Sequence, residues 1–256
     1  MKVLAVETAT AWQSVAILDE SQVLACHEQD AAGSHAKLLL PTIDRLFRET
    51  GLALTRLDGL AVSIGPGSFT GLRVGLATVL GLRTISQLPL AVVPTLEGMA
   101  WNLRGNSTQL CPILSSRRGE LYWALFRWNR DGRLERVISE QVGTTTMLGD
   151  SLTGPALVFG EGWKAEEAAI RASIPASAMV TEAPGSVMRP TAVSIGLAGI
   201  EQFRQGQYAG TGISPLYVQR PAAELKYEES GGMSPVTWRQ ERVARKALSR
   251  PVKREA

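Results

Sequence analysis

Residues 60–75 read LAVSIGPGSFTGLRVG, and their order predicts a strand, a tight turn and a helix. The apolar run at 60–64 is typical of a buried strand, and two glycines around Pro66 make a tight turn. We expect the helix to continue to about Ser86, with Ser68 or Thr70 as its cap. The first N–H groups of such a helix suit an anion, and a turn without a ligand is the alternative. The run fits neither a Walker A loop nor GxGxxG spacing.

The sequence divides into two halves, in which the predicted strands and helices follow in a similar order. In the first half, the patterns predict strands at 3–6, 14–18, 22–29, 60–64 and 90–93, and helices at 34–47, up to 86 and from Pro94. In the second half, strands are expected at 109–114, 120–128, 134–140 and 156–159, with helices at about 164–172 and 191–205. Pro41 should bend the first helix or mark a weak start. The chain is therefore predicted to be an α/β protein with a mixed sheet.

The composition, with 45% apolar and 20% charged residues in 256, is typical of globular proteins. It excludes a disordered chain, a fibrous repeat and a coiled coil. The longest apolar runs are broken before the roughly 18 residues that a membrane span requires, and Glu7 ends the N-terminal run too early for a signal peptide. Cys26 and Cys111 belong to no CxxC pattern, so neither a disulfide framework nor a zinc site is indicated. The cytoplasm is the expected location.

The basic charge of the chain is concentrated near its C-terminus. Residues 226–256 hold eight Lys and Arg against four Asp and Glu, whereas residues 1–225 are close to neutral. We expect residues 225–256 to form a basic, flexible tail, which is more often a solvated appendage than a reader of nucleic acid. Direct contact of this tail with a nucleic acid is the alternative.

The helix that follows residue 68 contains three glycines, Gly71, Gly75 and Gly81, in an otherwise apolar run. A glycine inside a helix costs about 0.8–1 kcal/mol relative to alanine. Gly71, Gly75, Thr78 and Leu82 share one face, so another helix could approach closely there. Packing within the chain and an interface between subunits both explain this strip.

Polar residues that could carry chemistry are few. Glu7, Thr8 and Thr10 end the first strand, where they could hold phosphate and a metal ion, and a solvated hairpin is the alternative. The two histidines, His27 and His35, form neither HxxxH nor HExxH, and no serine lies in a GxSxG elbow. The residues by themselves therefore identify no catalytic group and no metal site.

Five segments together resemble the TsaB (YeaZ) family. They are KVLAVETAT at 2–10, Ser34-His35 followed by LLP at 39–41, GPGSFTGLRVG at 65–75, RRGELY at 117–122 and PLYV at 215–218. The GPGSFTGLRVG run is the most specific, and the match extends over about residues 1–224. The resemblance implies a two-lobe actin-like ATPase fold of the ASKHA, ribonuclease H-like group. It implies an N-terminal lobe at 1–105, a degenerate C-terminal lobe at 106–224 and the tail at 225–256.

The function that the resemblance implies is that of an accessory scaffold. Such a subunit binds and activates TsaD, the transferase that forms threonylcarbamoyladenosine next to the anticodon of tRNA. TsaE is a further implied partner, the chain is a homodimer when alone, and tRNA is contacted through the complex. The implied partner interface lies on the helices after the Ser-His and GPGSFTG motifs, at Ser34, His35, Leu39, Ile43, Gly71, Gly75, Thr78 and Leu82.

The resemblance also bears on catalysis and cofactors. It implies that this chain has no catalytic residue, no metal site and no required cofactor, although ATP or ADP could lie at the joint surface with partners. The candidate nucleotide or anion site comprises Glu7, Thr8, Thr10, Gly65, Gly67 and Ser68. Ser115 and Ser116 occupy the second hairpin, at 114–119, where relatives usually keep an aspartate, so the ATPase pattern is incomplete. The alternative is a nucleotide-binding kinase or hydrolase of the actin-like group, and peptidase activity is not supported.

Overall fold

The computed structural model describes residues 1–117 and 119–218, and Met1–Val218 forms one compact unit. Its first sheet has the strand order β3-β2-β1-β4-β5. Strands β1 and β2 are antiparallel, as are β2 and β3, whereas β4 and β5 run parallel to β1. The strands are β1 (Lys2–Glu7), β2 (Trp12–Asp19), β3 (Gln22–Asp30), β4 (Gly59–Ser63) and β5 (Leu90–Val93).

The second sheet repeats the antiparallel opening of the first. Its order is β10-β9-β6-β7-β8, in which β6, β7 and β8 form the meander and β9 runs parallel to β6. The strands are β6 (Gln109–Ser115), β7 (Leu121–Trp128), β8 (Leu134–Gly143), β9 (Ala156–Phe159) and β10 (Val180–Glu182).

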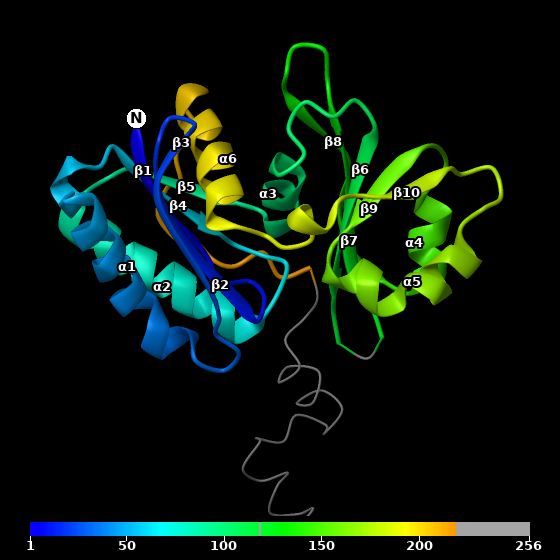
Figure 1. Cartoon of the computed structure of the whole chain (residues 1–256), viewed down its shortest axis with the longest axis horizontal. Coiled ribbons are helices and arrows are strands. Elements are labelled where there is room, and N and C mark those ends of the chain that lie inside the picture. Colours follow the sequence, from blue (N-terminus) through cyan, green and yellow to red (C-terminus); the bar gives the residue numbers. More distant parts are fainter. Residues whose placement is uncertain (118, 219–256) are drawn as a thin grey trace, which may run out of the picture. The chain divides into compact units, whose positions relative to one another are not determined.

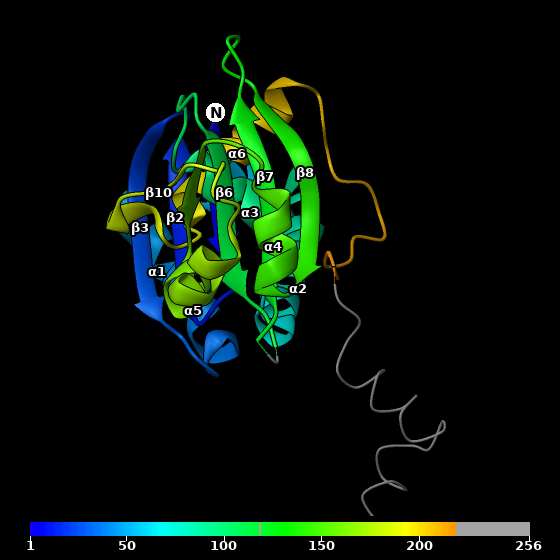
Figure 2. The ribbon, with the colours of Figure 1, turned by 90° about the vertical axis from the view of Figure 1, so that its right-hand side faces the viewer.

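Helices α3 and α6 lie between the two sheets, and the other four helices cover the outer faces (Figure 1). Helices α1 and α2 pack on the outer face of the first sheet, whereas α6 covers its inner face and packs on α3. Helix α3 also contacts β6 and β7, and α4 and α5 cover the far side of the second sheet (Figure 2). The helices are α1 (His35–Thr50), α2 (Phe69–Ser86), α3 (Thr95–Trp101), α4 (Thr145–Ser151), α5 (Glu161–Ser173) and α6 (Ala192–Arg204), with single 3-10 turns at Leu54–Arg56 and Gly185–Val187.

Strand β1 shows why the first sheet is buried on both faces. Val3 and Ala5 belong to the core around α3 and α6, whereas Leu4 and Val6 belong to the core beneath α1 and α2. Successive side chains of a strand point to opposite faces, so a continuous apolar run is what a strand between two helical layers requires. A third core lies between the second sheet and the pair α4 and α5.

Most of the predicted elements are confirmed, with three differences. Helix α1 begins at His35 and runs through Pro41 to Thr50, so Pro41 marks no weak start. Helix α4 and strand β10 were not predicted. Helix α4 has seven residues and only Leu148 and Gly149 are buried, while β10 has three residues. Elements this short carry too few apolar residues to show a period.

The C-terminal segment of the described chain returns to the first sheet. The N–H of Ala209 donates to Leu90 O at 2.8 Å, the Arg83 guanidinium donates to the carbonyls of Ala209 and Gly210, and Leu216 N–H donates to Ile64 O at 2.6 Å. The predicted tail at 225–256 lies outside the described residues. Within the described part, Cys26 and Cys111 are free thiols. No helix there has the length and apolar character needed to cross a membrane.

Candidate functional site

The turn between β1 and β2 lies beneath the start of α2, and its acidic residue is fully buried. Glu7 has no exposed surface, and one of its carboxylate oxygens accepts the Ala9 N–H. Burial raises the pKa of Glu7 to about 7, although hydrogen bonds from Ala9, Ser63 and Thr8 act in the opposite direction. Thr8 is also fully buried and donates its hydroxyl to Gly71 O at 2.9 Å. Both side chains therefore face the interior of the chain.

The glycines of the GPGSFTG turn permit close packing within the chain. A side chain at Gly67, whose φ is +154°, would overlap Ala9, and one at Gly65, whose φ is +114°, would lie 2.8 Å from Leu216 O. Ser68 caps α2 by accepting the Gly71 N–H at 3.2 Å, as predicted. Four members of the expected nucleotide or anion site, Glu7, Thr8, Gly65 and Gly67, are thus occupied by contacts within the chain.

The remaining two members of that group, Thr10 and Ser68, line a cavity of about 390 Å³. The cavity is bounded by the β1–β2 turn, the residues that enter α1 and the first turns of α2. His35 also lines it, together with Thr70 and Gly71. The structure therefore joins part of the expected anion site to His35, which the sequence had assigned to the partner interface.

The expected partner interface needs correction, because five of its residues are buried within the chain. Leu39 and Ile43 belong to the core beneath α1, and His35 is buried against the β1–β2 turn, where its Nε2 lies 2.9 Å from Thr10 O. Gly71 and Gly75 are buried too, because a side-chain carbon at either position would overlap Thr8. These two glycines serve packing within the chain, which was one of the two explanations that the sequence left open.

The other three residues of that group, Ser34, Thr78 and Leu82, are half-buried and stay a prediction. The outward surface of the two helices contains residues that the sequence reasoning did not assign. Ala77 and Gly81 are exposed on α2, Ile85 is 80% exposed and Leu40 on α1 is 55% exposed. The helical period could have identified this side of α2, because Ala77, Gly81 and Ile85 are spaced at intervals of four.

Side chains from distant parts of the chain contact one another beside Trp12, at the start of β2. The Arg189 guanidinium lies 4.1 Å from the centre of the Trp12 ring. Glu161 begins α5, and burial raises the pKa of its carboxyl while Arg189 lowers it. Gly160 packs against Ile113, and Gly162 packs against Leu114 and Ser115, at the end of β6. Among the described residues, no group of three or more His, Cys, Asp or Glu is placed to hold a metal ion.

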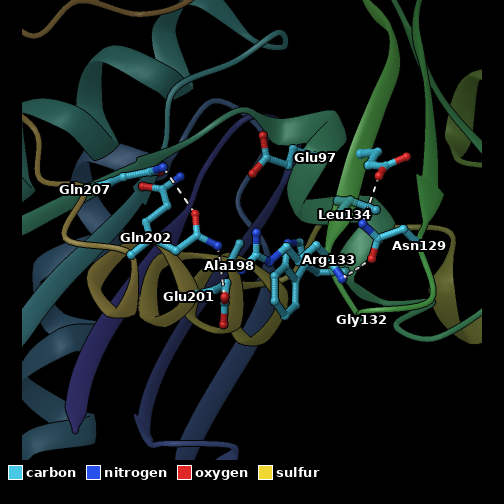
Figure 3. Close-up of a pocket in the computed structure, with 12 residues that line it drawn as sticks. Glu97, Asn129, Gly132, Arg133, Leu134, Ala198, Glu201, Gln202 and Gln207 are labelled. Carbon is cyan, nitrogen blue, oxygen red and sulfur yellow. Dashed lines mark hydrogen bonds between the residues drawn. The ribbon is translucent and has the colours of Figure 1, made fainter.

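A second hollow, of about 410 Å³, lies between α3, α6 and the turn that joins β7 to β8. Figure 3 shows Glu97 between residues of α6, such as Glu201 and Gln202, and the turn residues Asn129 to Leu134. Its carboxylates already have partners within the chain. Arg136 pairs with Glu97 at 2.5 Å, Gln205 donates to Glu201, and Asn129 donates to Glu135. The lining is therefore a satisfied polar network.

Comparisons with known proteins identify the family. A family model described as TsaD, tRNA N6-adenosine threonylcarbamoyltransferase, matches residues 26–154. The tRNA threonylcarbamoyladenosine biosynthesis protein TsaB of Escherichia coli K12 is 33% identical over 173 residues, which are 64% of this chain and 73% of that protein. This chain belongs to the TsaB family. The TsaB of Bacillus subtilis 168 is 27% identical over 236 residues, which are 90% of this chain and 99% of that protein.

Solved structures agree with the TsaB assignment and with the predicted fold. YeaZ from Pseudomonas aeruginosa has a TM-score of 0.70 and 27% sequence identity, and the match covers 84% of this chain and 99% of that one. The ethanolamine utilization protein EutJ from Carboxydothermus hydrogenoformans, at 12% identity and a TM-score of 0.51, shares the fold alone. The two-lobe actin-like ATPase fold is confirmed.

Proposed function

We propose that this TsaB-family chain is an accessory, non-catalytic subunit that binds and activates a TsaD-type transferase in the formation of threonylcarbamoyladenosine on tRNA. The names of its relatives support the process, because those of Escherichia coli and Bacillus subtilis are both named for the biosynthesis of this modification. The geometry of α2 supports the docking surface. The residues at the ends of β1 and β6 support the lack of catalysis.

The observation that carries the proposal is the outward side of α2. Gly81 lies inside the helix, yet no other part of the described chain comes within 4 Å of the place where its Cβ would sit. The chain's own contacts thus leave the cost of this glycine, about 0.8–1 kcal/mol, without compensation. Ala77 precedes it by one turn and Ile85 follows it by one turn. A partner helix packed on this small and apolar surface would supply the missing contacts.

The absence of catalysis in this chain is supported by what lies at its two turns. The first turn offers Glu7 only in a fully buried position, where it accepts the chain's own N–H group. The second turn contains Ser115 and Ser116, which supply hydroxyls where an actin-like ATPase needs a carboxylate. The same burial of Glu7 argues against the alternative of an ATP-dependent kinase or hydrolase.

The remaining parts of the proposal concern the assembly. We infer a homodimer for the chain alone, TsaE as a further partner, and contact with tRNA through the complex. ATP or ADP at the joint surface and a cytoplasmic location complete this proposal. The homodimer and the pair with TsaD use the same outward side of α1 and α2, so formation of one replaces the other.

The test is light scattering coupled to size-exclusion chromatography, with this chain alone and mixed with TsaD from the same genome. We expect a 1:1 complex to replace the homodimer, and Gly81→Gln to weaken it. The matched control is Gly185→Gln, because Gly185 is exposed and equally open but lies in a 3-10 turn far along the chain. Pairing of Gly81→Gln as tightly as the control would refute the docking surface. A reconstituted transfer assay that proceeds equally without this chain would refute activation.

A further inference from the structure

The outward side of α2 carries a single type of charge. The helix contains two arginines, Arg73 and Arg83, and no acidic residue. Arg83 is used within the chain, because its guanidinium donates to two backbone carbonyls at 2.8 Å each. Arg73 is exposed and precedes Ala77 by one turn, so it continues the row that Ala77, Gly81 and Ile85 form. The docking surface therefore includes a cation at its N-terminal end.

Two aromatic rings hold the Arg73 side chain in place. Its Cζ lies 3.7 Å from the centre of the Phe69 ring, and its Nε donates to the Tyr217 hydroxyl at 3.1 Å. The rings of Phe69 and Tyr217 are stacked, with centres 5.0 Å apart. Tyr217 is fixed beside α2 because its neighbour Leu216 donates its N–H to Ile64 O at 2.6 Å. The PLYV segment at 215–218 thus orients an arginine of α2.

The two terminal nitrogens of Arg73 are left for a ligand. Nη1 and Nη2 have no hydrogen-bond or ion-pair partner within residues 1–117 and 119–218. A guanidinium presents such a pair of nitrogens to both oxygens of a carboxylate, in two parallel hydrogen bonds. An arginine that is already oriented loses less conformational freedom when it binds. The group is therefore preorganised for a carboxylate.

A second copy of this chain offers no unpaired carboxylate on the two helices of the docking surface. Helix α2 has no acidic residue, and α1 has only Asp44 and Glu49. Asp44 pairs with Arg48, and Glu49 pairs with Arg45, within their own helix. In a homodimer that uses these helices, Arg73 would face no unpaired acid from either helix.

We propose that Arg73 binds an aspartate or glutamate side chain of the TsaD-type partner, and that this ion pair favours the partner over a second copy of the chain. The inference rests on the proposed function, since it gives the chemistry of the same docking surface. Tyr217 is a positioning residue, because its hydroxyl holds the guanidinium that makes the contact.

The experiment measures the affinity of the full chain for TsaD from the same genome by titration calorimetry. Arg73→Gln should weaken pairing by about tenfold, and Arg73→Glu by about a hundredfold, because the second variant adds repulsion between carboxylates. Both replacements are good helix formers, so α2 should keep its circular dichroism spectrum. Light scattering should show that Arg73→Gln forms the homodimer as readily as the native chain. The matched control is Arg130→Gln, which removes the same charge from the exposed turn between β7 and β8.

Salt dependence separates the charge of Arg73 from its orientation. Arg73→Gln should flatten the fall of affinity with salt concentration, because the ion pair is lost. Tyr217→Phe keeps the ring on Phe69 but removes the hydroxyl that accepts from Nε. It should lower the affinity by about threefold with the salt dependence unchanged, since the charge remains. A flattened salt dependence for Tyr217→Phe would contradict its role as a positioning residue.

The outcomes distinguish this inference from the function on which it rests. If the native chain does not pair with TsaD, the proposed function fails and the inference fails with it. If Gly81→Gln weakens pairing while Arg73→Gln pairs as tightly as Arg130→Gln, only the inference is overturned. Equal losses for Arg73→Gln and Arg73→Glu would show that no carboxylate faces Arg73. An equal loss of the homodimer would refute the preference for the partner.

Discussion

Helix α2 contains glycines in two different surroundings, near its start and near its end. Gly71 and Gly75 are buried, and any side chain there would overlap Thr8 in the turn between β1 and β2. Gly81 is exposed and meets nothing within 4 Å. At the start of α2, glycine therefore lets the helix approach the β1–β2 turn. Near the end of α2, no contact within the chain requires a glycine. The comparison teaches that a small residue must be judged by what faces it, because its position in a helical pattern does not give the partner.

The largest effect is expected from a side chain at the buried end. Gly75→Leu forces an isobutyl group against the Thr8 side chain, whose hydroxyl donates to Gly71 O at 2.9 Å. Because Thr8 is fully buried and cannot move without breaking the packing beneath α2, we expect destabilisation of more than about 4 kcal/mol. Chemical denaturation followed by circular dichroism measures it. The matched control, Gly81→Leu, should keep the native spectrum, and equal losses in the two variants would contradict the comparison.

A second prediction concerns Glu7, which precedes Thr8, the residue that faces Gly71 and Gly75. Its pKa is raised from 4.5 to about 7, so the folded state favours the protonated carboxyl. The protonated Glu7 carboxyl therefore contributes to the free energy of unfolding below pH 4.5, and this contribution is lost as the pH rises through 7. Glu7→Gln keeps an acceptor for Ala9 N–H without the charge. At pH 8 the variant should be more stable than the native chain by up to about 3 kcal/mol, with little difference near pH 5.

Denaturant midpoints across this pH range measure that difference. The control Glu49→Gln removes an exposed carboxylate of α1, which pairs with Arg45 at 2.6 Å, and should leave the slope with pH nearly unchanged. Parallel pH profiles for the native chain and Glu7→Gln would show that Glu7 titrates normally in the folded protein.

Most of the fold could be predicted, because its strands are bounded by strong signals. Strand β5 was predicted with its observed bounds, since an apolar run lies between Pro89 and Pro94. Helix α4 could not be predicted, because seven residues with one large buried side chain show no helical period. Of the two expectations for Pro41, the bend stays a prediction. The weak start was wrong, because α1 gains more from packing Leu39, Ile43 and Leu46 than one lost hydrogen bond costs.

The candidate site was less predictable than the fold. A helical pattern shows that Gly71, Gly75 and Thr78 share a face but does not say whether that face is inside. The position of His35 was also hidden, because its neighbours Thr10 and Thr70 are 25 and 35 residues away along the chain. Only tertiary structure brings the starts of α1 and α2 to one cavity.

The exposed end of α2 offers a third prediction. Ile85 is 80% exposed, so Ile85→Ser should change the free energy of unfolding by less than about 0.5 kcal/mol. If the partner covers this end, the variant loses apolar contact in the complex, and affinity for TsaD should fall by about tenfold. Titration calorimetry measures the affinity. The control Val137→Ser removes another exposed aliphatic side chain, on β8, and should pair normally. Normal affinity of Ile85→Ser would remove the end of α2 from the interface.

The smallest expected effect separates stability from pairing at Gly81. Gly81→Ala should raise the free energy of unfolding by about 0.8–1 kcal/mol, because alanine restricts the unfolded chain and meets nothing in the folded one. Calorimetric melting of the chain at a concentration below that of dimer formation measures it. The same methyl group at Gly71 should destabilise, since it would overlap Thr8 O. Natural sequences are not optimised for stability, so this gain alone assigns no function to Gly81. Gly81→Ala that gains stability and yet pairs more weakly with TsaD would assign Gly81 to the interface, whereas unchanged pairing would mean that the partner leaves Gly81 uncovered.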